Sequence, residues 1–183
     1  MPVIAHKFST HQVDPETELL ILGTFNPDVS SGPDFFYGRP RNFLWQLLPY
    51  CWGIPSLKGL SLQIKKDFMT QHKVDFVDLI HTVNVPDGQE NNVADAYIDN
   101  KVQEWKDVMG LIDTLPQLKM VCFTRKTFSG IPQIRAQIIA IQEHCRQKGI
   151  RFYALATPAR FTNVAKQQEW INAIIFTDQS KQP

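Results

Sequence analysis

Short apolar runs recur along the chain, separated by longer stretches in which apolar residues follow a helical period. Four of these runs have the length and composition of buried β-strands. They cover residues 18–23, 74–80, 118–123 and 150–155, and the first of them ends in Gly23. The pattern therefore predicts four strands.

The stretches between the runs predict helices. Apolar residues at helical spacing indicate helices over 93–112 and 131–145, and Gly149 is placed to end the second of these. Another helix is expected to begin near Asn42, and a last one after Asn163, because asparagine is a favourable N-cap. The predicted order of elements is β, α, α, β, α, β, α, β, α.

This alternation predicts an α/β fold with three layers, α/β/α, around a central, mostly parallel four-stranded sheet. We expect a single domain over residues 1–183, with a frayed tail from about residue 177. In such folds, ligands bind beyond the carboxyl ends of the strands. A functional site is therefore expected in the loops that follow Gly23 and Leu155.

Composition and charge narrow the possible classes of function. The 183 residues carry a formal net charge of +1, so only a local cluster of cations could attract a nucleic acid. The three cysteines are widely spaced and the five histidines show no ligand spacing, so we expect no disulfide, metal site or cofactor. No apolar run is long enough to span a membrane, and we expect a monomeric, cytoplasmic protein that works at the nucleoid without a membrane partner.

The loop after the first strand, residues 23–45, is the part of the chain richest in turn formers, amides and aromatic residues. It places a side-chain amide, Asn26, at the end of the strand, followed by hydroxyls, aromatic residues and two arginines before a helix N-terminus. This suggests a polar pocket with an aromatic wall. The alternative is an ordinary strand-to-helix loop whose Phe35 and Phe36 fold into the core.

Two parts of the chain resemble motifs of the uracil-DNA glycosylase superfamily. Residues 26–31, Asn-Pro-Asp-Val-Ser-Ser, and 39–45, Arg-Pro-Arg-Asn-Phe-Leu-Trp, are similar to the first motif of mismatch-specific uracil and thymine glycosylases. Residues 36–42, Phe-Tyr-Gly-Arg-Pro-Arg-Asn, are also similar to the Tyr-Tyr-Ala-His-Pro-Arg-Asn run of hypoxanthine-DNA glycosylases. Residues 156–163, Ala-Thr-Pro-Ala-Arg-Phe-Thr-Asn, stand where the superfamily has its second motif, a loop that wedges into DNA.

The resemblance implies a monofunctional DNA glycosylase of base excision repair, which hydrolyses the N-glycosidic bond of a flipped uracil- or hypoxanthine-type base. Asp28 stands where the mismatch enzymes have glycine, and Arg39 where both groups usually have histidine. The second motif also lacks the histidine that stabilises the departing base in the fast uracil enzymes. The alternatives are a nucleic-acid- or nucleotide-binding protein of the same fold with lost or very weak catalysis, and a metabolic nucleotide hydrolase.

Two asparagines are candidates for the group that holds the attacking water. The mismatch enzymes imply Asn26, and the hypoxanthine enzymes imply Asn42. We favour Asn26, because it directly follows the first strand and Pro27 restricts its backbone. Asn42 precedes an apolar helix, which favours a role as N-cap. An amide is not a strong general base, so we expect a slow enzyme that relies on positioning and electrostatics.

Other residues of the two motifs are expected to bind the base and the DNA. The resemblance implies base contacts from Phe25, Ser31, Tyr37 and Thr157. Tyr37 would stack on the flipped base, and the alternative is an aromatic residue of the core or rim. DNA contacts are implied for Arg39, Arg41, Pro158, Ala159, Arg160 and Phe161. For Arg160 and Phe161, the alternative is a helix-entry residue followed by a core phenylalanine.

Overall fold

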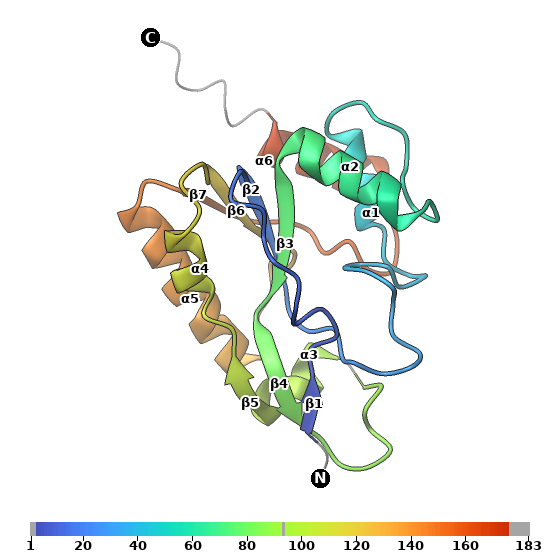
Figure 1. Ribbon diagram of the computed structural model, residues 1–183, viewed down its shortest axis with the longest axis vertical. Helices are drawn as coiled ribbons and strands as arrows, with labels where there is room; N and C mark the ends of the chain where they lie inside the picture. The colour runs from blue at the N-terminus through green and yellow to red at the C-terminus, as the bar shows by residue number, and fades with distance from the viewer. Residues whose placement is uncertain (1–2, 93, 176–183) are drawn as a thin grey trace.

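A computed structural model describes residues 3–92 and 94–175 (Figure 1). The four predicted strands are present, as β2 (Leu19–Gly23), β3 (Val74–Asp78), β6 (Met120–Phe123) and β7 (Arg151–Ala154). They form a parallel sheet in the order β3-β2-β6-β7. Gly23, the last residue of β2, lies opposite Asp78, the last residue of β3. The carboxyl ends of the strands therefore share one edge. The tail predicted to fray lies outside the described residues.

Helices cover both faces of this sheet and complete the three predicted layers (Figure 1). One face carries α1 (Leu44–Tyr50), α2 (Leu62–His72) and α6 (Val164–Ile174), and the other carries α4 (Val108–Asp113) and α5 (Pro132–Gln147). Successive side chains of the buried strand β2 alternate between two apolar clusters. Leu20 and Leu22 belong to the cluster under α4 and α5, and Leu19 and Ile21 to the cluster under α1, α2 and α6.

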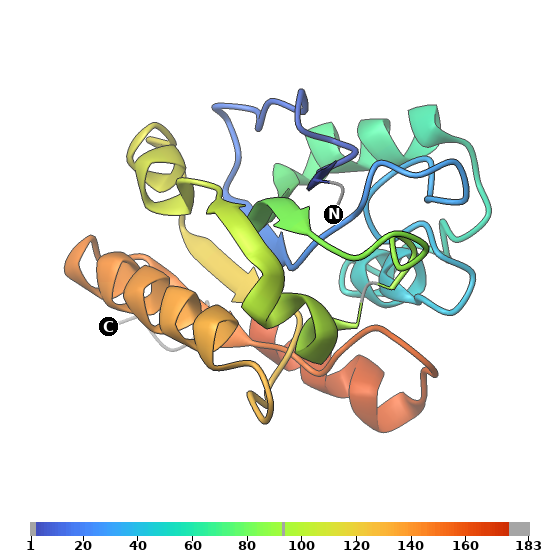
Figure 2. The ribbon, with the colours of Figure 1, turned by 90° about the horizontal axis from the view of Figure 1, so that it is seen from below.

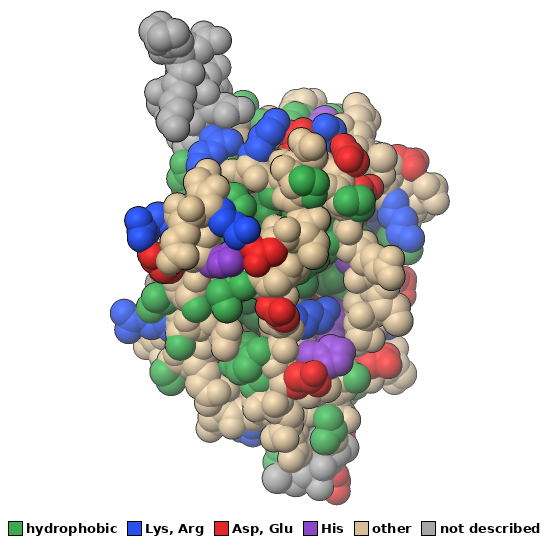
Figure 3. Space-filling view, turned by 60° about the vertical axis from the view of Figure 1, so that its left-hand side comes forward, with side chains coloured by type: hydrophobic (Ala, Val, Ile, Leu, Met, Phe, Trp, Pro, Cys, Tyr) green, Lys and Arg blue, Asp and Glu red, His purple; other side chains and the backbone are tan. Residues whose placement is uncertain are grey.

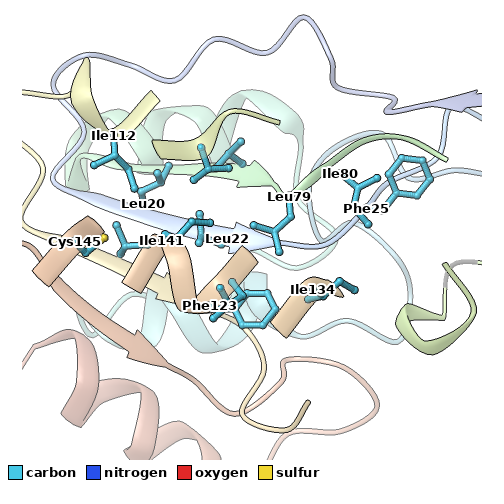
Figure 4. Close-up of a cluster of buried hydrophobic side chains, with 14 of the residues drawn as sticks. Leu20, Leu22, Phe25, Leu79, Ile80, Ile112, Phe123, Ile134, Ile141 and Cys145 are labelled. Carbon is cyan, nitrogen blue, oxygen red and sulfur yellow. The ribbon is translucent and has the colours of Figure 1, made fainter. Parts of the chain in front are cut away.

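Helix α5 confirms the helix predicted over 131–145. Its apolar face, which includes Ile134, Ile141 and Cys145, packs on the sheet (Figure 4). The carboxylate of Asp99 accepts hydrogen bonds from two backbone N–H groups in the first turn, at 2.7 and 3.1 Å. Gly149 follows the helix with a φ of 70°, a left-handed conformation that glycine adopts at little cost. Both ends of the helix are therefore where the sequence places them.

The other two predicted helix starts are also confirmed. Helix α6 begins after Asn163, whose side-chain oxygen accepts a hydrogen bond from the backbone N–H of Lys166 at 2.8 Å. Helix α1 begins at Leu44, two residues after Asn42. Because α1 and α6 contact each other, the loops that lead into them are brought to the same side of the sheet.

The single helix predicted over 93–112 is wrong. The described part of this stretch contains α3 (Asp95–Ile98), the 3₁₀ turn η1 (Asp99–Lys101), strand β5 (Val102–Trp105) and α4. Strand β5 joins β1 (Val3–Ala5) and β4 (Ile80–Asn84) in a second, antiparallel sheet of order β1-β4-β5. Val102 and Trp105 fit a helical period, but they pair with β4, so strand pairing overrides the local pattern. Val93 lies outside the described residues.

The second sheet extends directly from the carboxyl edge of the first, because only Leu79 separates β3 from β4. The segment after β1 then crosses the loop that follows β2. His6 forms an isolated antiparallel bridge with Pro27, and the backbone N–H of Asp28 donates to Ala5 at 2.9 Å. The N-terminal segment thus holds the loop in which the site was predicted. No helix within 3–92 and 94–175 is long and apolar enough to span a bilayer.

Candidate active site at the carboxyl edge of the sheet

The loops after β2 and β7 both lie at the carboxyl edge of the parallel sheet. Figure 2 views the molecule from this side, with the blue segment after β2, the cyan helix α1 and the orange-red segment after β7. At this edge, Gly23 ends β2 and Thr124 follows β6. The structure therefore brings the two motif segments to the place that the fold class predicts.

Tyr37 covers part of this edge. Its hydroxyl lies 3.2 Å from the Thr124 hydroxyl, and its ring centroid lies 5.6 Å from that of Phe76. Burial raises the pKa of the Tyr37 hydroxyl well above its usual value and the Asp78 carboxylate raises it further, so the hydroxyl keeps its proton at neutral pH. Its φ of 56° is a left-handed conformation, which is costly for an aromatic residue and concentrates at functional sites.

Asn26 lies at the start of the loop after β2 and is partly exposed. Its Nδ2 donates to Oδ2 of Asp78 at 2.6 Å, and its backbone oxygen accepts from the N–H of Lys7 at 2.8 Å. Within the described residues, its side-chain oxygen Oδ1 takes part in no hydrogen bond. The amide is therefore fixed at its donor end and has a free acceptor.

Asn42 lies just before the start of helix α1. Its Oδ1 accepts a hydrogen bond from the backbone N–H of Leu44 at 3.0 Å. Phe43 stands at the N-cap position itself and its side chain makes no cap. The predicted N-cap position is therefore one residue off, and Asn42 instead makes a local turn bond to the first N–H of the helix, which uses one of the two lone pairs of its side-chain oxygen.

The two motif segments are paired through their backbones. Asn42 and Ala159 form an isolated antiparallel bridge. The N–H of Phe43 donates to the oxygen of Pro158, and the N–H of Arg160 donates to the oxygen of Arg41, each at 2.8 Å. This two-bond ladder, named here the motif bridge, joins parts of the chain that are far apart in sequence.

The tip of the second motif is exposed. Arg160 has a φ of 76°, and the Phe161 side chain is 55% exposed, so its alternative role as a core phenylalanine is wrong. Lys166 holds this tip, because its Nζ donates to the Phe161 oxygen at 2.7 Å and lies 4.0 Å from the centre of the ring. Thr157 is exposed, and its Oγ1 accepts a hydrogen bond from the N–H of Ala159 on the same loop at 3.3 Å.

Phe25 and Ser31 have surroundings that differ from those predicted for base-binding residues. Phe25 is buried in the apolar cluster beside Ile80, as Figure 4 shows. Ser31 is exposed and donates to the side-chain oxygen of Asn91 at 2.7 Å. Among the described residues, no hydrogen bond or ring contact joins either of them to Tyr37. Core packing accounts for Phe25 and loop hydrogen bonding for Ser31 in this structure.

Several cations surround the motif bridge. Arg41 and Arg160 are exposed. Arg39 is partly buried, and its Nη2 has no hydrogen-bond partner within the described residues. Lys58 lies over the ring of Phe43, 3.6 Å from its centre, and donates to the backbone of the first motif. The side of the molecule that carries α4 and α5 instead shows interspersed charges of both signs (Figure 3). The motif bridge is therefore flanked by several cationic side chains.

Sequence reasoning missed two buried residues at this edge, His6 and Asp78. Nε2 of His6 lies 2.7 Å from Oδ2 of Asp78, the same oxygen that accepts from Asn26. Both side chains are almost fully buried. A carboxylate at the carboxyl end of an apolar strand was the available signal for Asp78. In the part of the chain that the structure describes, no group of three or more His, Cys, Asp or Glu residues could hold a metal ion.

Two surface hollows, each of about 460 Å³, are lined by residues of the segment after β1, and one of them also by Asp34 and Phe35 of the loop after β2. They share His11, Gln12 and Lys66 in their linings. Neither is lined by Asn26 or Tyr37. The predicted polar pocket with an aromatic wall is therefore not one of these hollows, and Tyr37 fills the space beside Gly23 and Asp78, where such a pocket would open.

Comparison with known proteins agrees with the predicted resemblance. No protein-family model matches the chain. It is 27% identical over 124 residues to a hypoxanthine DNA glycosylase of Methanosarcina acetivorans, covering 67% of this chain and 73% of the relative. It is 28% identical over 114 residues to a hypoxanthine DNA glycosylase of Methanosarcina barkeri, covering 62% and 67%.

The fold is also shared with a solved structure. The solution NMR structure of a candidate uracil DNA glycosylase from Methanosarcina acetivorans matches with a TM-score of 0.60 and 22% identity. The match covers 88% of this chain and 91% of the other. At this identity, the match establishes the fold. The shared fold and the two sequence relatives together support the resemblance of this chain to the uracil-DNA glycosylase superfamily.

Proposed function

We propose that this chain is a monofunctional DNA glycosylase of base excision repair, which hydrolyses the N-glycosidic bond of a deaminated base flipped out of DNA. The observation that carries the proposal is the motif bridge, which joins the segment of Asn42 to the exposed tip at Arg160 and Phe161. Hypoxanthine is the first candidate base, because both sequence relatives are hypoxanthine DNA glycosylases, and uracil is the second. DNA is the partner that this reaction requires.

The chemistry requires a water held against the sugar and polar groups that meet charge developing in the transition state. A group that orients a water must accept a hydrogen bond from it. Oδ1 of Asn26 accepts no hydrogen bond within the described residues, whereas Oδ1 of Asn42 already accepts one, from the N–H of Leu44, which also fixes its direction. This geometry supports Asn26 as the group that holds the water. The names of the relatives favour Asn42 instead, so the two roles are separated by experiment below.

Tyr37 is the proposed base-stacking residue. It lies at the edge where a flipped base would enter, and its pKa is raised by burial, so it remains a neutral phenol. Its side chain now fills this space, with its hydroxyl next to that of Thr124. Binding of a base therefore requires the Tyr37 ring to move and then to pack against the base face. Its left-handed backbone conformation supports a role in the site rather than in folding.

The exposed tip of the second motif is the proposed wedge. Phe161 is more than half exposed, and Arg160 beside it is also exposed. Such a pair can enter the space that a flipped nucleotide leaves. Arg41 lies across the motif bridge, where it can contact backbone phosphate. Because the net charge is only +1, binding is expected to depend on these few cations and to weaken as salt rises.

The test is an assay for base release. Duplex and single-stranded oligonucleotides that carry hypoxanthine, uracil or a G·T mismatch are incubated with the protein and then treated with alkali, which cleaves abasic sites. We expect cleavage at hypoxanthine or uracil and none in undamaged strands. Tight, selective binding without cleavage would instead support the alternative, a binding protein of the same fold. The predictions of a monomer and of a cytoplasmic location remain predictions.

A further inference from the structure

Two aspartate–histidine pairs join the N-terminal segment to strand β3. Nε2 of His6 lies 2.7 Å from Oδ2 of Asp78, and Nε2 of His11 lies 2.7 Å from Oδ1 of Asp75. The two aspartates are both buried, with exposed fractions of 1% and 3%. Their other partners differ, since Asp78 accepts a hydrogen bond from the Asn26 amide, whereas Asp75 accepts from the backbone N–H groups of Asp14 and Phe76. The two pairs therefore provide a natural comparison.

The hydrogen bonds of His6 define its tautomer and the direction of its bond to Asp78. The backbone N–H of Phe8 donates to Nδ1 of His6 at 3.1 Å, so Nδ1 carries no proton. The proton of the neutral ring is then on Nε2, which donates to Oδ2 of Asp78. Asn26 donates to the same oxygen at 2.6 Å. Oδ2 of Asp78 therefore accepts two hydrogen bonds, one on each of its lone pairs.

This acceptor fixes the orientation of the Asn26 amide. An asparagine side chain has a donor end and an acceptor end that exchange places when the group turns by half a rotation. Turning the Asn26 amide would place its oxygen against the carboxylate of Asp78, and the two acceptors would repel each other. The backbone of Asn26 is held as well. The backbone N–H of Lys7 donates to the backbone oxygen of Asn26, and Pro27 restricts the backbone conformation of Asn26. Oδ1 must therefore point away from Asp78.

We infer that Asp78 is a positioning residue, whose carboxylate, held by His6, fixes the Asn26 amide with its oxygen free to accept from the attacking water. This inference rests on the proposed function, because it concerns the water that Asn26 is proposed to hold. It assigns the N-terminal segment a part in the reaction, through His6. Loss of Asp78 frees the amide to rotate, which lowers the rate of the chemical step and leaves DNA binding nearly unchanged.

The test compares Asp78→Ala with Asp75→Ala, which removes a similar buried partner of a histidine without touching Asn26. Under single-turnover conditions, we expect Asp78→Ala to lower the maximal rate by about 10-fold or more with a half-saturating concentration within about twofold of wild type. Asp75→Ala should keep the rate. Asp78→Asn, which retains an oxygen able to accept from Asn26, should recover most of the loss. In an Asn26→Ala background, Asp78→Ala should cause no further fall.

Equal losses in Asp78→Ala and Asp75→Ala, or a full loss from Asp78→Ala when Asn26 is absent, would overturn the inference. If Asp78→Ala does not fold, the hydrogen bond between Asn26 and Asp78 can still be tested by NMR on the wild-type protein. The side-chain NH₂ signals of Asn26, identified by their absence in Asn26→Ala, should show a downfield, slowly exchanging proton. If both protons instead have the chemical shifts and fast exchange of a solvent-exposed amide, the inference is also overturned. If wild type releases no base from any substrate, the proposed function fails, and the NMR signals still report whether Asp78 holds the amide.

Discussion

Substitution of Gly23 by alanine should disturb the site at its centre. Gly23 is the last residue of β2, opposite Asp78 in the sheet. A Cβ at this position would overlap Oδ1 of Asp78 and lie 3.2 Å from its Cγ and 3.0 Å from the Tyr37 hydroxyl oxygen. The Asp78 carboxylate cannot simply turn away, because it is 1% exposed and holds His6 and Asn26. Either the carboxylate or the Tyr37 ring must move.

The magnitude follows from these contacts. Adding a carbon to a packed interior costs about 1 to 3 kcal/mol. Loss of one hydrogen bond to a charged group adds about 1.5 to 3 kcal/mol. Together, Gly23→Ala should lower the free energy of unfolding by about 2.5 to 6 kcal/mol. In a protein of this size, each kcal/mol lowers Tm by about 2 to 4 °C, so we expect a fall of about 5 to 24 °C.

Thermal unfolding followed by circular dichroism, with denaturant titration as a second measure, gives the value. Gly53→Ala is the control, because Gly53 has a φ of 70° and a Cβ there would meet nothing within 4 Å. It should show only the cost of left-handed backbone, about 1 to 2 kcal/mol. A Gly23→Ala protein that is as stable as Gly53→Ala would refute the packing argument, and full base-release activity would show that Asp78 and Tyr37 tolerate displacement.

Three further predictions concern catalysis, the wedge and the cysteines. Asn26→Ala should lower the single-turnover rate about 10²-fold with little change in Tm. Asn42→Ala should instead lower the free energy of unfolding by about 1 kcal/mol. A larger rate loss in Asn42→Ala than in Asn26→Ala would make Asn42 the residue that holds the water. Replacing Arg160 and Phe161 together by alanine should lower activity on duplex far more than on single-stranded substrate, and equal losses would exclude a wedge. Burial raises the pKa of all three cysteine thiols, that of Cys145 to about 11, so few thiolates exist at pH 8 and Ellman's reagent should react slowly until the protein is unfolded. Rapid reaction of the native protein would contradict this burial.

The parallel sheet could be predicted because its strands are continuous apolar runs, and the site's location followed from the carboxyl-edge rule. Helix α5 was equally clear, since its period, its first-turn proline and Gly149 agree. The fate of three consecutive aromatics was not predictable. Phe35 and Phe36 are 7% and 0% exposed in the core, whereas Tyr37 turns to the sheet edge. A loop has no period that distinguishes inward from outward positions.

The missed parts of the site depend on contacts between distant segments. His6 meets Asp78, and Pro27 pairs with His6, although nothing in the local sequence around any of them indicates a partner. Asp78 ends an apolar strand, where a carboxylate is costly unless it is paired, and that cost was the one local sign of its role. Strand β5 was missed for the same reason, because its pairing with β4 is a tertiary contact.

The motif bridge sets an order on the folding of this chain during its synthesis. Asn26, Tyr37 and Asn42 leave the ribosome more than 100 residues before Ala159, the partner of Asn42. The hydrogen bonds of the motif bridge close a long loop of chain. They can form only after β7, which precedes Ala159, has paired with β6. A nascent chain that has not yet reached Ala159 therefore carries the first motif without the backbone segment that pairs with it.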